Sequence, residues 1–200
     1  MIALPAILSP AQVENARLIL REFALAGYPL GVGIAGVVNA YAESRLDARA
    51  VSPGAEDSVG LFQLNSAPRA AGEGMSTAAR MNPTTNTRRI LEVLRQTPSV
   101  MAAHNRGAPV RELSAVFARD VERHGGGEAE NQRRRELTDR FFPLYSQTAS
   151  NRLPSPLLLA PALLPWWVYA TGAVLALTSA VALSRPRRSR KRLGRPRGRL

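Results

Sequence analysis

The stretch Gly31-Val-Gly-Ile-Ala-Gly-Val-Val-Asn-Ala-Tyr-Ala-Glu43-Ser44 is apolar on nearly all sides and ends in two polar residues. Its Val, Ile and Ala content predicts a helix over about residues 31–44, and a helix without a polar face is usually buried. We therefore expect the central helix of a domain here. Its last turn delivers Glu43 to the edge of the core.

Further elements are predicted on both sides of this helix. Ser9-Pro10 is typical of an N-cap followed by proline at the first helical position, and Gly27 is typical of the helix end. Between 46 and 65, turn residues and short extended runs around Gly60 favour a small hairpin. Other helices are expected over Thr84–Arg95 after Asn82-Pro83, near Ser99–Ala103, over Pro109–Arg123 and over Glu128–Phe142. The predicted fold class is α+β, mostly α, with a small β-hairpin.

Composition limits the kinds of chemistry available. The 200 residues fit one medium domain with an appendage. Because the chain has no cysteine, it has no disulfide, thiolate nucleophile or thiolate metal site. The only two histidines, His104 and His124, form no cluster with acids at a recognisable metal-ligand spacing. We therefore expect neither a metal nor a cofactor.

An uncharged segment follows the predicted domain. No charged residue occurs from Leu153 to Ser184, and an unbroken apolar run of about 18 residues extends from Trp166 to Leu183. The aromatic cluster at its start resembles an interfacial belt. The segment 165–184 is predicted to be a single transmembrane helix that contacts lipid. The alternative is a buried helix of a soluble domain.

The basic character of the chain is concentrated at its end. Residues 1–152 carry 18 Arg and all 15 acidic residues, a net charge of +3, whereas 185–200 carry +9. Repulsion together with Pro and Gly predicts a disordered tail, which can bind anionic lipid or nucleic acid. We divide the chain into a domain over 1–145, a Pro-rich linker over 146–164, the membrane helix over 165–184 and the tail over 185–200.

Glu43 is the strongest candidate for a chemical role. A carboxyl group beside apolar neighbours has its charged form disfavoured, so that it holds a proton near neutral pH. A general acid needs such a proton to protonate a leaving oxygen, as in cleavage of a glycosidic bond. The plainer interpretation of a lone Glu in this position is a solvated side chain near a helix end.

Four short motifs occur in order after the central helix begins. They are Glu43-Ser44, Gly60-Leu61-Phe62-Gln63, Asn82-Pro83-x-x-Asn86 and Ala102-Ala103-His104-Asn105-Arg106-Gly107. Together they resemble the lytic transglycosylase domain, in the goose-type-lysozyme-like branch of the lysozyme superfamily. The resemblance covers about residues 30 to 110. It implies a lysozyme-like fold that cleaves the bond between N-acetylmuramic acid and N-acetylglucosamine in peptidoglycan.

The resemblance also implies roles for individual residues. Glu43 matches the catalytic acid, and Gln63 offers an amide to the N-acetyl or hydroxyl groups of the sugar. His104 stands where the family usually has Tyr, so a direct contact with the sugar and a structural role in a turn both remain open. The implied substrate-binding residues are Ser44, Ser58, Gly60, Leu61, Gln63, His104 and Asn105.

A second carboxylate would distinguish between mechanisms. Glycoside hydrolases commonly use two carboxylates, about 5 to 9.5 Å apart. By sequence order the candidates are Asp47, Glu56, Asp57 and Glu73, and none matches a family nucleophile. The family works with one Glu and the N-acetyl group of the substrate, and it yields an anhydro-sugar. A lytic transglycosylase is therefore preferred, with a hydrolytic muramidase as the alternative.

The cellular setting follows from the same features. The start Met1-Ile-Ala-Leu-Pro5 lacks the pattern of a secretory signal, although the wall lies outside the membrane. One expectation is a bacteriophage virion with a membrane, acting in entry or release, with virion proteins as partners and the tail facing the genome. Another is a wall-remodelling enzyme of a secretion or conjugation system, anchored in the bacterial inner membrane with its catalytic domain facing the wall. A glycan-binding scaffold and a nucleic-acid-binding membrane protein are the non-enzymatic alternatives.

Overall fold

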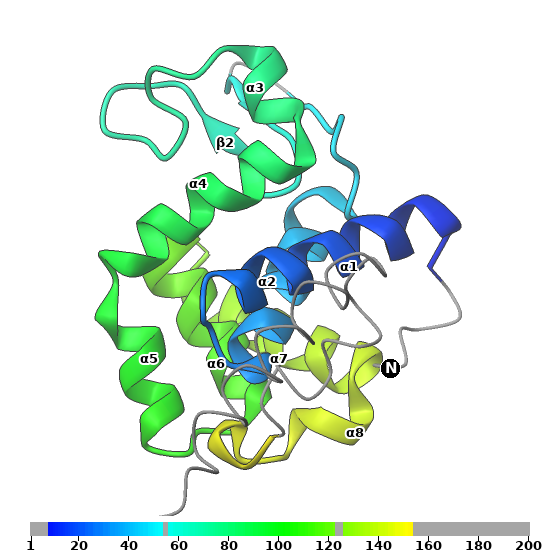
Figure 1. The fold of residues 1–200 in the computed structure, drawn as a ribbon, viewed down its shortest axis with the longest axis vertical. Coiled ribbons are helices and arrows are strands. Elements are labelled where there is room, and N and C mark those ends of the chain that lie inside the picture. Colours follow the sequence, from blue (N-terminus) through cyan, green and yellow to red (C-terminus); the bar gives the residue numbers. More distant parts are fainter. Residues whose placement is uncertain (1–7, 54–55, 123–125, 154–200) are drawn as a thin grey trace, which may run out of the picture. The chain divides into compact units, whose positions relative to one another are not determined.

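Helices dominate the computed structural model, which describes residues 8–53, 56–122 and 126–153 (Figure 1). The helices are α1 (Pro10–Leu25), α2 (Leu30–Ser44), α3 (Thr77–Met81), α4 (Pro83–Arg95), α5 (Pro98–Asn105), α6 (Val110–Phe117), α7 (Gly127–Phe141) and α8 (Pro143–Ser146). A π-helical turn, Ala118–Glu122, continues α6, and a 3-10 turn spans Ser150–Arg152. Strands β1 (Ser58–Val59) and β2 (Leu64–Asn65) pair antiparallel, with Ser58 opposite Asn65 and Val59 opposite Leu64. The mostly helical α+β class with a small hairpin is confirmed.

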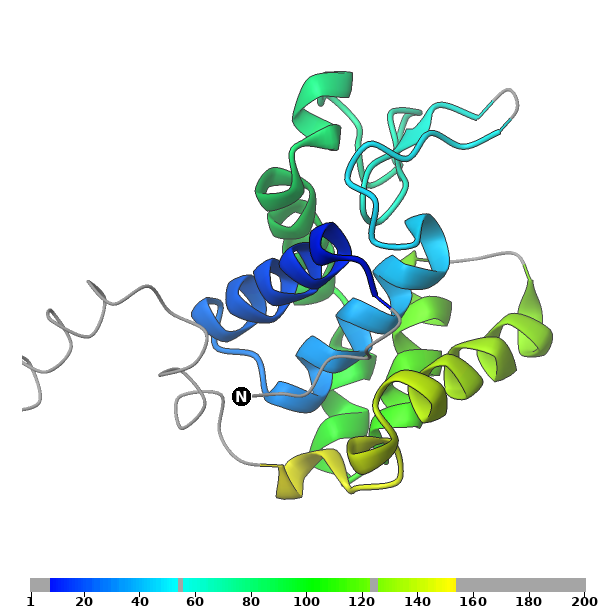
Figure 2. The ribbon, with the colours of Figure 1, turned by 90° about the vertical axis from the view of Figure 1, so that its right-hand side faces the viewer.

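Helix α2 is the centre of the core, as predicted. Twelve of its 15 residues are buried, and α1, α6 and α7 pack against it (Figure 2). Glycine allows the closest approach: a Cβ on Gly36 would lie 2.6 Å from Cζ of Phe23. Close packing on several sides fixes α2, and with it the position of Glu43 in its last turn.

The predicted helix ends are also present. Ser9 caps α1 through a capping box with Gln12, and Pro10 is the first helical residue. Gly27, with a φ of 82°, is one residue beyond the C-cap Ala26. Asn82 caps α4, because its side chain accepts a hydrogen bond from the backbone N–H of Thr85.

Several segments differ from the prediction. The helix expected over Pro109–Arg123 changes to a π-helical turn after Phe117. Helix α3 and the turns after Pro143 are too short to show helical periodicity. Part of the expected linker, residues 146–153, packs onto the domain, since Ser150 N–H donates to the Ala108 carbonyl at 3.0 Å.

The C-terminal predictions concern residues that the structure does not describe. The expected membrane helix at 165–184 and the basic tail at 185–200 both lie outside the described ranges. Within those ranges, no helix has the length and apolar character needed to cross a bilayer.

Two buried polar side chains hold the hairpin against α3 and α4. The guanidinium of Arg80 donates to the Leu64 carbonyl at 2.8 Å and pairs with Asp57 at 2.6 Å. The side chain of Asn86 accepts from Phe62 N–H at 3.1 Å and donates to the Arg80 carbonyl at 2.6 Å. These bonds fix the Gly60–Gln63 motif relative to the helices.

Gly60 gives a test of this packing. Its φ is 83°, and a Cβ there would lie 2.3 Å from the Arg80 carbonyl oxygen. Gly60→Ala is expected to lower the free energy of unfolding by roughly 2 to 6 kcal/mol, from backbone strain and the clash together. Gly74→Ala is the matched control, because Gly74 has a φ of 75° but open space around it. It should cost about 1 to 2 kcal/mol. Equal losses in denaturant unfolding would show that the space around Gly60 is not restrictive.

Candidate active site

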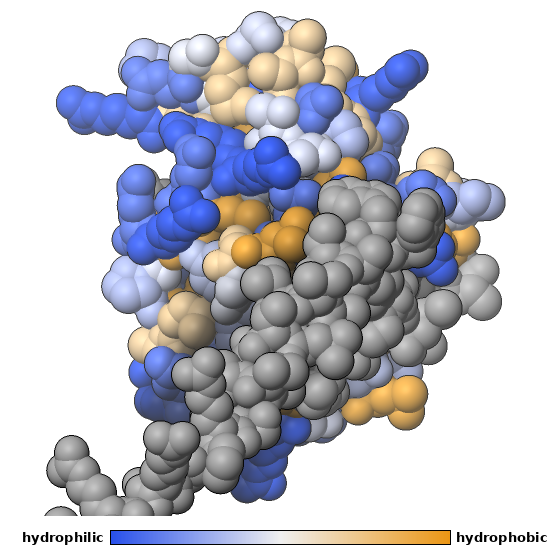
Figure 3. All heavy atoms as spheres, viewed as in Figure 1, coloured by the Kyte–Doolittle hydropathy of each residue, from blue (hydrophilic) through white to orange (hydrophobic). Residues whose placement is uncertain are grey.

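A pocket of about 410 Å³ lies between the hairpin, α4, the end of α2 and the Ala118–Glu122 turn. Its apolar lining is Phe62, Leu64, Ala70, Ala71, Ile90, Val93 and Val121, and its polar lining is Glu43, Gln63, Asn65, Arg69, Arg89, Gln96 and Glu122. On the face shown in Figure 3, hydrophilic side chains gather over α4. A hollow that combines apolar surface with amides and charges suits a polar organic ligand.

Glu43 faces this pocket from the last turn of α2. Its side chain is 27% exposed, and its Oε1 accepts a hydrogen bond from Nη2 of Arg134 at 2.5 Å. The prediction of a carboxyl surrounded by apolar groups is therefore wrong for the carboxyl itself. The reason is tertiary: α7 packs against α2 and brings a cation to the helix end.

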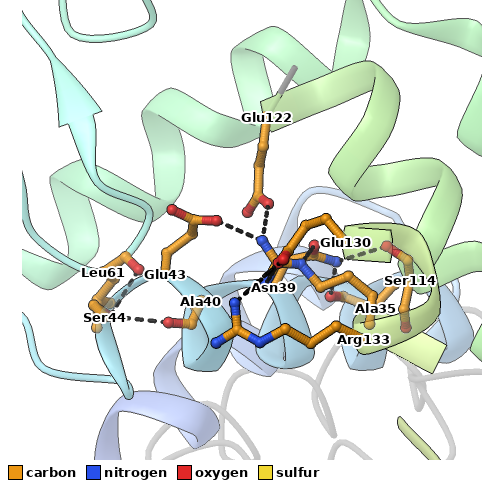
Figure 4. A network of polar contacts seen from close by, with 11 residues as sticks. Ala35, Asn39, Ala40, Glu43, Ser44, Leu61, Ser114, Glu122, Glu130 and Arg133 are labelled. Carbon is orange, nitrogen blue, oxygen red and sulfur yellow. Dashed lines mark hydrogen bonds and ion pairs between the residues drawn. The ribbon is translucent and has the colours of Figure 1, made fainter. Parts of the chain in front are cut away.

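Arg134 is the centre of a polar cluster, and its partners Asn39, Glu43, Glu122 and Glu130 are labelled in Figure 4. Its side chain is only 1% exposed, and its Nη2 also lies 3.3 Å from Glu122. Its Nη1 lies 2.7 Å from Glu130 as an ion pair that is not aligned for a hydrogen bond. Its Nε donates to Oδ1 of Asn39 at 2.8 Å. One cation thus serves three carboxylates.

Asn39 explains why Arg134 is held so firmly. It lies one turn before Glu43 on α2 and is fully buried. Its amide nitrogen donates to the carbonyls of Ala35 at 2.8 Å and Ser114 at 3.0 Å. These bonds turn the amide oxygen towards Arg134, so the polar break in an apolar helix serves to orient the cluster.

Glu122 is the second carboxyl group of the pocket, and it was not predicted from the sequence. Its side chain is 5% exposed, and its Oε1 has no hydrogen-bond partner among the described residues. Burial raises the pKa of Glu122 to about 8, and the nearby Glu43 and Glu130 charges add to the rise while Arg134 opposes it. At neutral pH this carboxyl therefore keeps its proton.

The candidates proposed from sequence order for the second carboxylate lie elsewhere. Asp47 accepts from the N–H of Arg49, Asp57 pairs with Arg80, and Glu73 accepts from the N–H of Arg69. Neither these three nor Glu56 lines the pocket. Glu122 gave no signal in the sequence, because Arg119-Asp120-Val-Glu122 has the pattern of an exposed helix face.

Of the predicted substrate-binding residues, only Gln63 lines the pocket. Its amide nitrogen donates to the carbonyls of Gly60 at 3.0 Å and Ala50 at 3.3 Å. Ser44 donates to the Leu61 carbonyl at 2.8 Å and joins the hairpin to α2. Ser44, Ser58, Gly60 and Leu61 are buried at this junction. These four residues do not line the pocket but pack behind the residues that do.

His104 and Asn105 lie at the end of α5, away from the hairpin (Figure 1). His104 is buried, its Nδ1 lies 3.1 Å from Oγ of Ser150, and burial lowers its pKa. Asn105 is exposed. Neither residue lines the pocket. For His104, the structure supports the alternative of a buried His with a structural role, although it lies in the last turn of α5 and not in a loop turn.

Known proteins give no guide to this site. The sequence matches no protein-family model, and neither the curated proteins nor the solved structures contain a match. Across the described ranges, no group of three or more His, Cys, Asp or Glu side chains is arranged to hold a metal ion. Function must therefore be inferred from the chemistry of the pocket.

Proposed function

We propose that this protein cleaves the bond between N-acetylmuramic acid and N-acetylglucosamine in peptidoglycan, as a lytic transglycosylase with a lysozyme-like domain. The observation that carries the proposal is that Glu43 and Gln63, which belong to two of the four ordered motifs, line one pocket. A general acid has to lie within hydrogen-bond reach of the oxygen that it protonates. A carboxyl group in the pocket wall can reach the glycosidic oxygen of a glycan bound there.

The remaining pocket residues suit a glycan substrate. The apolar lining offers surface for the faces of the sugar rings, and Asn65 and Gln96 supply amides for hydroxyl and acetamido groups. Arg69 and Arg89 add guanidinium groups, which bind carboxylates well. The peptide stems on muramic acid carry such carboxylates.

The chemistry requires one proton, which returns at the end of the cycle. Glu43 gives the proton to the glycosidic oxygen as the bond from that oxygen to the muramic acid C1 breaks. The C6 hydroxyl of the same sugar then bonds to C1 and returns its proton to Glu43, leaving an anhydro-sugar. In the muramidase alternative, water replaces this hydroxyl and a reducing end forms.

The distance between Glu122 and Glu43 and the burial of Glu122 both bear on the muramidase alternative. Its Oε2 and Oε1 of Glu43 lie 3.3 and 2.5 Å from the same Arg134 nitrogen. These two oxygens can be no further apart than the sum of those distances, which is less than the roughly 6.5 to 9.5 Å of inverting glycosidases. The limit still allows the roughly 5 to 5.5 Å of retaining enzymes, in which the second carboxylate is the nucleophile. A buried, neutral Glu122 is, however, a poor nucleophile. Transglycosylation is therefore the preferred chemistry.

Zymography of the full chain on purified peptidoglycan tests the proposal. We expect a clear zone where the wild-type protein renatures. Absence of clearing, combined with cosedimentation of the protein with peptidoglycan, would contradict an enzyme and support the glycan-binding scaffold.

The location remains a proposal resting on the C-terminal sequence. We propose attachment through residues 165–184, with the tail over 185–200 contacting anionic lipid or nucleic acid. A virion would bring the enzyme to the wall from outside, and anchoring in the bacterial inner membrane would bring it there from inside. Antibody against the chain should detect it in purified phage particles. Its absence there, with a signal in host inner membranes, would favour the wall-remodelling setting.

A further inference from the structure

We infer that Glu122 stores the proton used in the reaction, and that Arg134 couples Glu122 and Glu43 into one proton-sharing pair. The inference rests on the proposed function, since it names the proton source for the same pocket. Glu122 is then a positioning residue, because it acts on the substrate only through Glu43.

The geometry gives the pair a common anchor. Both carboxyl groups line the pocket, and both contact the same nitrogen of Arg134 (Figure 4). Oε1 of Glu122 is buried and has no hydrogen-bond partner within the described part of the chain. An ionised oxygen in that state is costly, whereas a protonated carboxyl avoids the cost.

The charged groups around Glu43 and Glu122 supply too little positive charge to neutralise both carboxyl groups, so the pair holds one proton. On α7, Arg134 faces the pair, and Glu130 is shared with Arg133 at 3.1 Å. On α4, Arg89 pairs with Glu92 at 2.6 Å, and on the π-helical turn Arg119 pairs with Asp120 at 2.7 Å. Arg134 therefore faces Glu43 and Glu122 as the main cation for two carboxyl groups. One retained proton makes this group of three neutral.

The site of that proton follows from burial. The Glu122 side chain is 5% exposed, against 27% for Glu43. Burial is the largest cause of the rise in the Glu122 pKa to about 8. The more exposed Glu43 is the group that a substrate in the pocket reaches first.

The proton moves as follows when a glycan fills the pocket. Because each carboxyl contacts Arg134, the proton passes from Glu122 to Glu43 through one water molecule in the pocket. Glu43 then gives it to the glycosidic oxygen, which also takes the electron pair of the breaking C1–O bond. The C6 hydroxyl that attacks C1 releases its proton to Glu43, and the pair returns to its starting state. No further reactant is needed.

The first test is the pH dependence of peptidoglycan solubilisation by the full chain. The wild-type rate should fall as the pH rises through about 8, where Glu122 loses its proton. In Glu122→Gln this fall should move to lower pH, and the rate at pH 8 should drop about tenfold for each pKa unit of that move. Glu136→Gln is the matched control, because Glu136 is an exposed residue of α7 that does not line the pocket. It should keep the wild-type profile, and an unchanged profile in Glu122→Gln would overturn the inference.

The second test is independent of activity. The folded-state pKa of Glu122, about 8, exceeds the ordinary glutamate value of 4.5, so the folded state binds this proton more tightly. The stability it contributes is complete below about pH 4.5 and is lost as the pH rises towards 8. The thermal unfolding midpoint of the wild type should fall as the pH rises over this window. The midpoint of Glu122→Gln should fall less over the same window. Identical slopes would overturn the inference whatever the activity. If the slopes are as expected but the protein has no activity, the proposed function is contradicted and the assignment of the proton to Glu122 is not.

Discussion

Glu43→Gln is expected to lower the initial rate of peptidoglycan solubilisation by about 10²- to 10⁴-fold, the usual contribution of a general acid. The amide has nearly the size of the carboxyl and its oxygen can still accept the hydrogen bond from Arg134. It cannot supply a proton at the pKa that the reaction requires. The loss should therefore appear in the rate while the fold is kept.

Glu14→Gln is the matched control for this variant. Glu14 is an exposed residue of α1 that does not line the pocket, and its substitution should leave the rate unchanged. Circular dichroism should show the same helix content for all three proteins. A Glu43→Gln protein that is folded and as active as the wild type would exclude Glu43 as the acid.

Arg134→Met is expected to lower the free energy of unfolding by about 3 to 5 kcal/mol, because it removes the buried cation shared by three buried or partly buried carboxyl groups. The three groups concerned are Glu43, Glu122 and Glu130, all of which contact Arg134. Urea unfolding at neutral pH measures the loss. Arg133→Met is the matched control: Arg133 is the preceding residue, but it is 47% exposed, and within the described ranges its ion pair is with Glu130. It should cost no more than about 1 kcal/mol.

A second variant keeps this prediction testable if Arg134→Met does not fold. In Arg134→Met combined with Glu43→Gln, one of the stranded charges is removed, so part of the lost stability should return. The loss should also shrink at acidic pH, where the carboxyl groups become protonated. Equal losses for the Arg134 and Arg133 variants would contradict the central position of Arg134.

The sequence predicts much of the fold because the relevant signals are local. The apolar run of α2, the Ser9-Pro10 start of α1 and the Asn82-Pro83 start of α4 each depend on neighbouring residues. The hairpin at Gly60 follows from a backbone conformation that glycine adopts easily.

The polar cluster could not be predicted in this way. Arg134 is the middle residue of Arg133-Arg134-Arg135 in a strongly charged helix, and no local pattern marks the one that is buried. Its burial depends on how α7 packs against α2 and α6. Asn39, a lone amide inside an apolar helix, was the one available hint that a polar partner would come from elsewhere.

The motif order also did not predict which residues share a site. Glu43 and Gln63 meet at the pocket because the hairpin folds back over the end of α2. His104 instead contacts Ser150, because the chain after α8 returns to cover α5. The order of the motifs along the chain does not determine towards which part of the fold the last turn of α5, with His104, is directed.

Mass spectrometry of the soluble products from purified peptidoglycan tests most directly whether Glu43 donates a proton to a muramic acid linkage. We predict muropeptides with anhydro-muramic acid ends from the wild-type chain and none from Glu43→Gln. Ends heavier by one water would assign the reaction to a muramidase using the same acid. If the wild type releases no muropeptides, or if Glu43→Gln releases as many, the proposed role of Glu43 is contradicted.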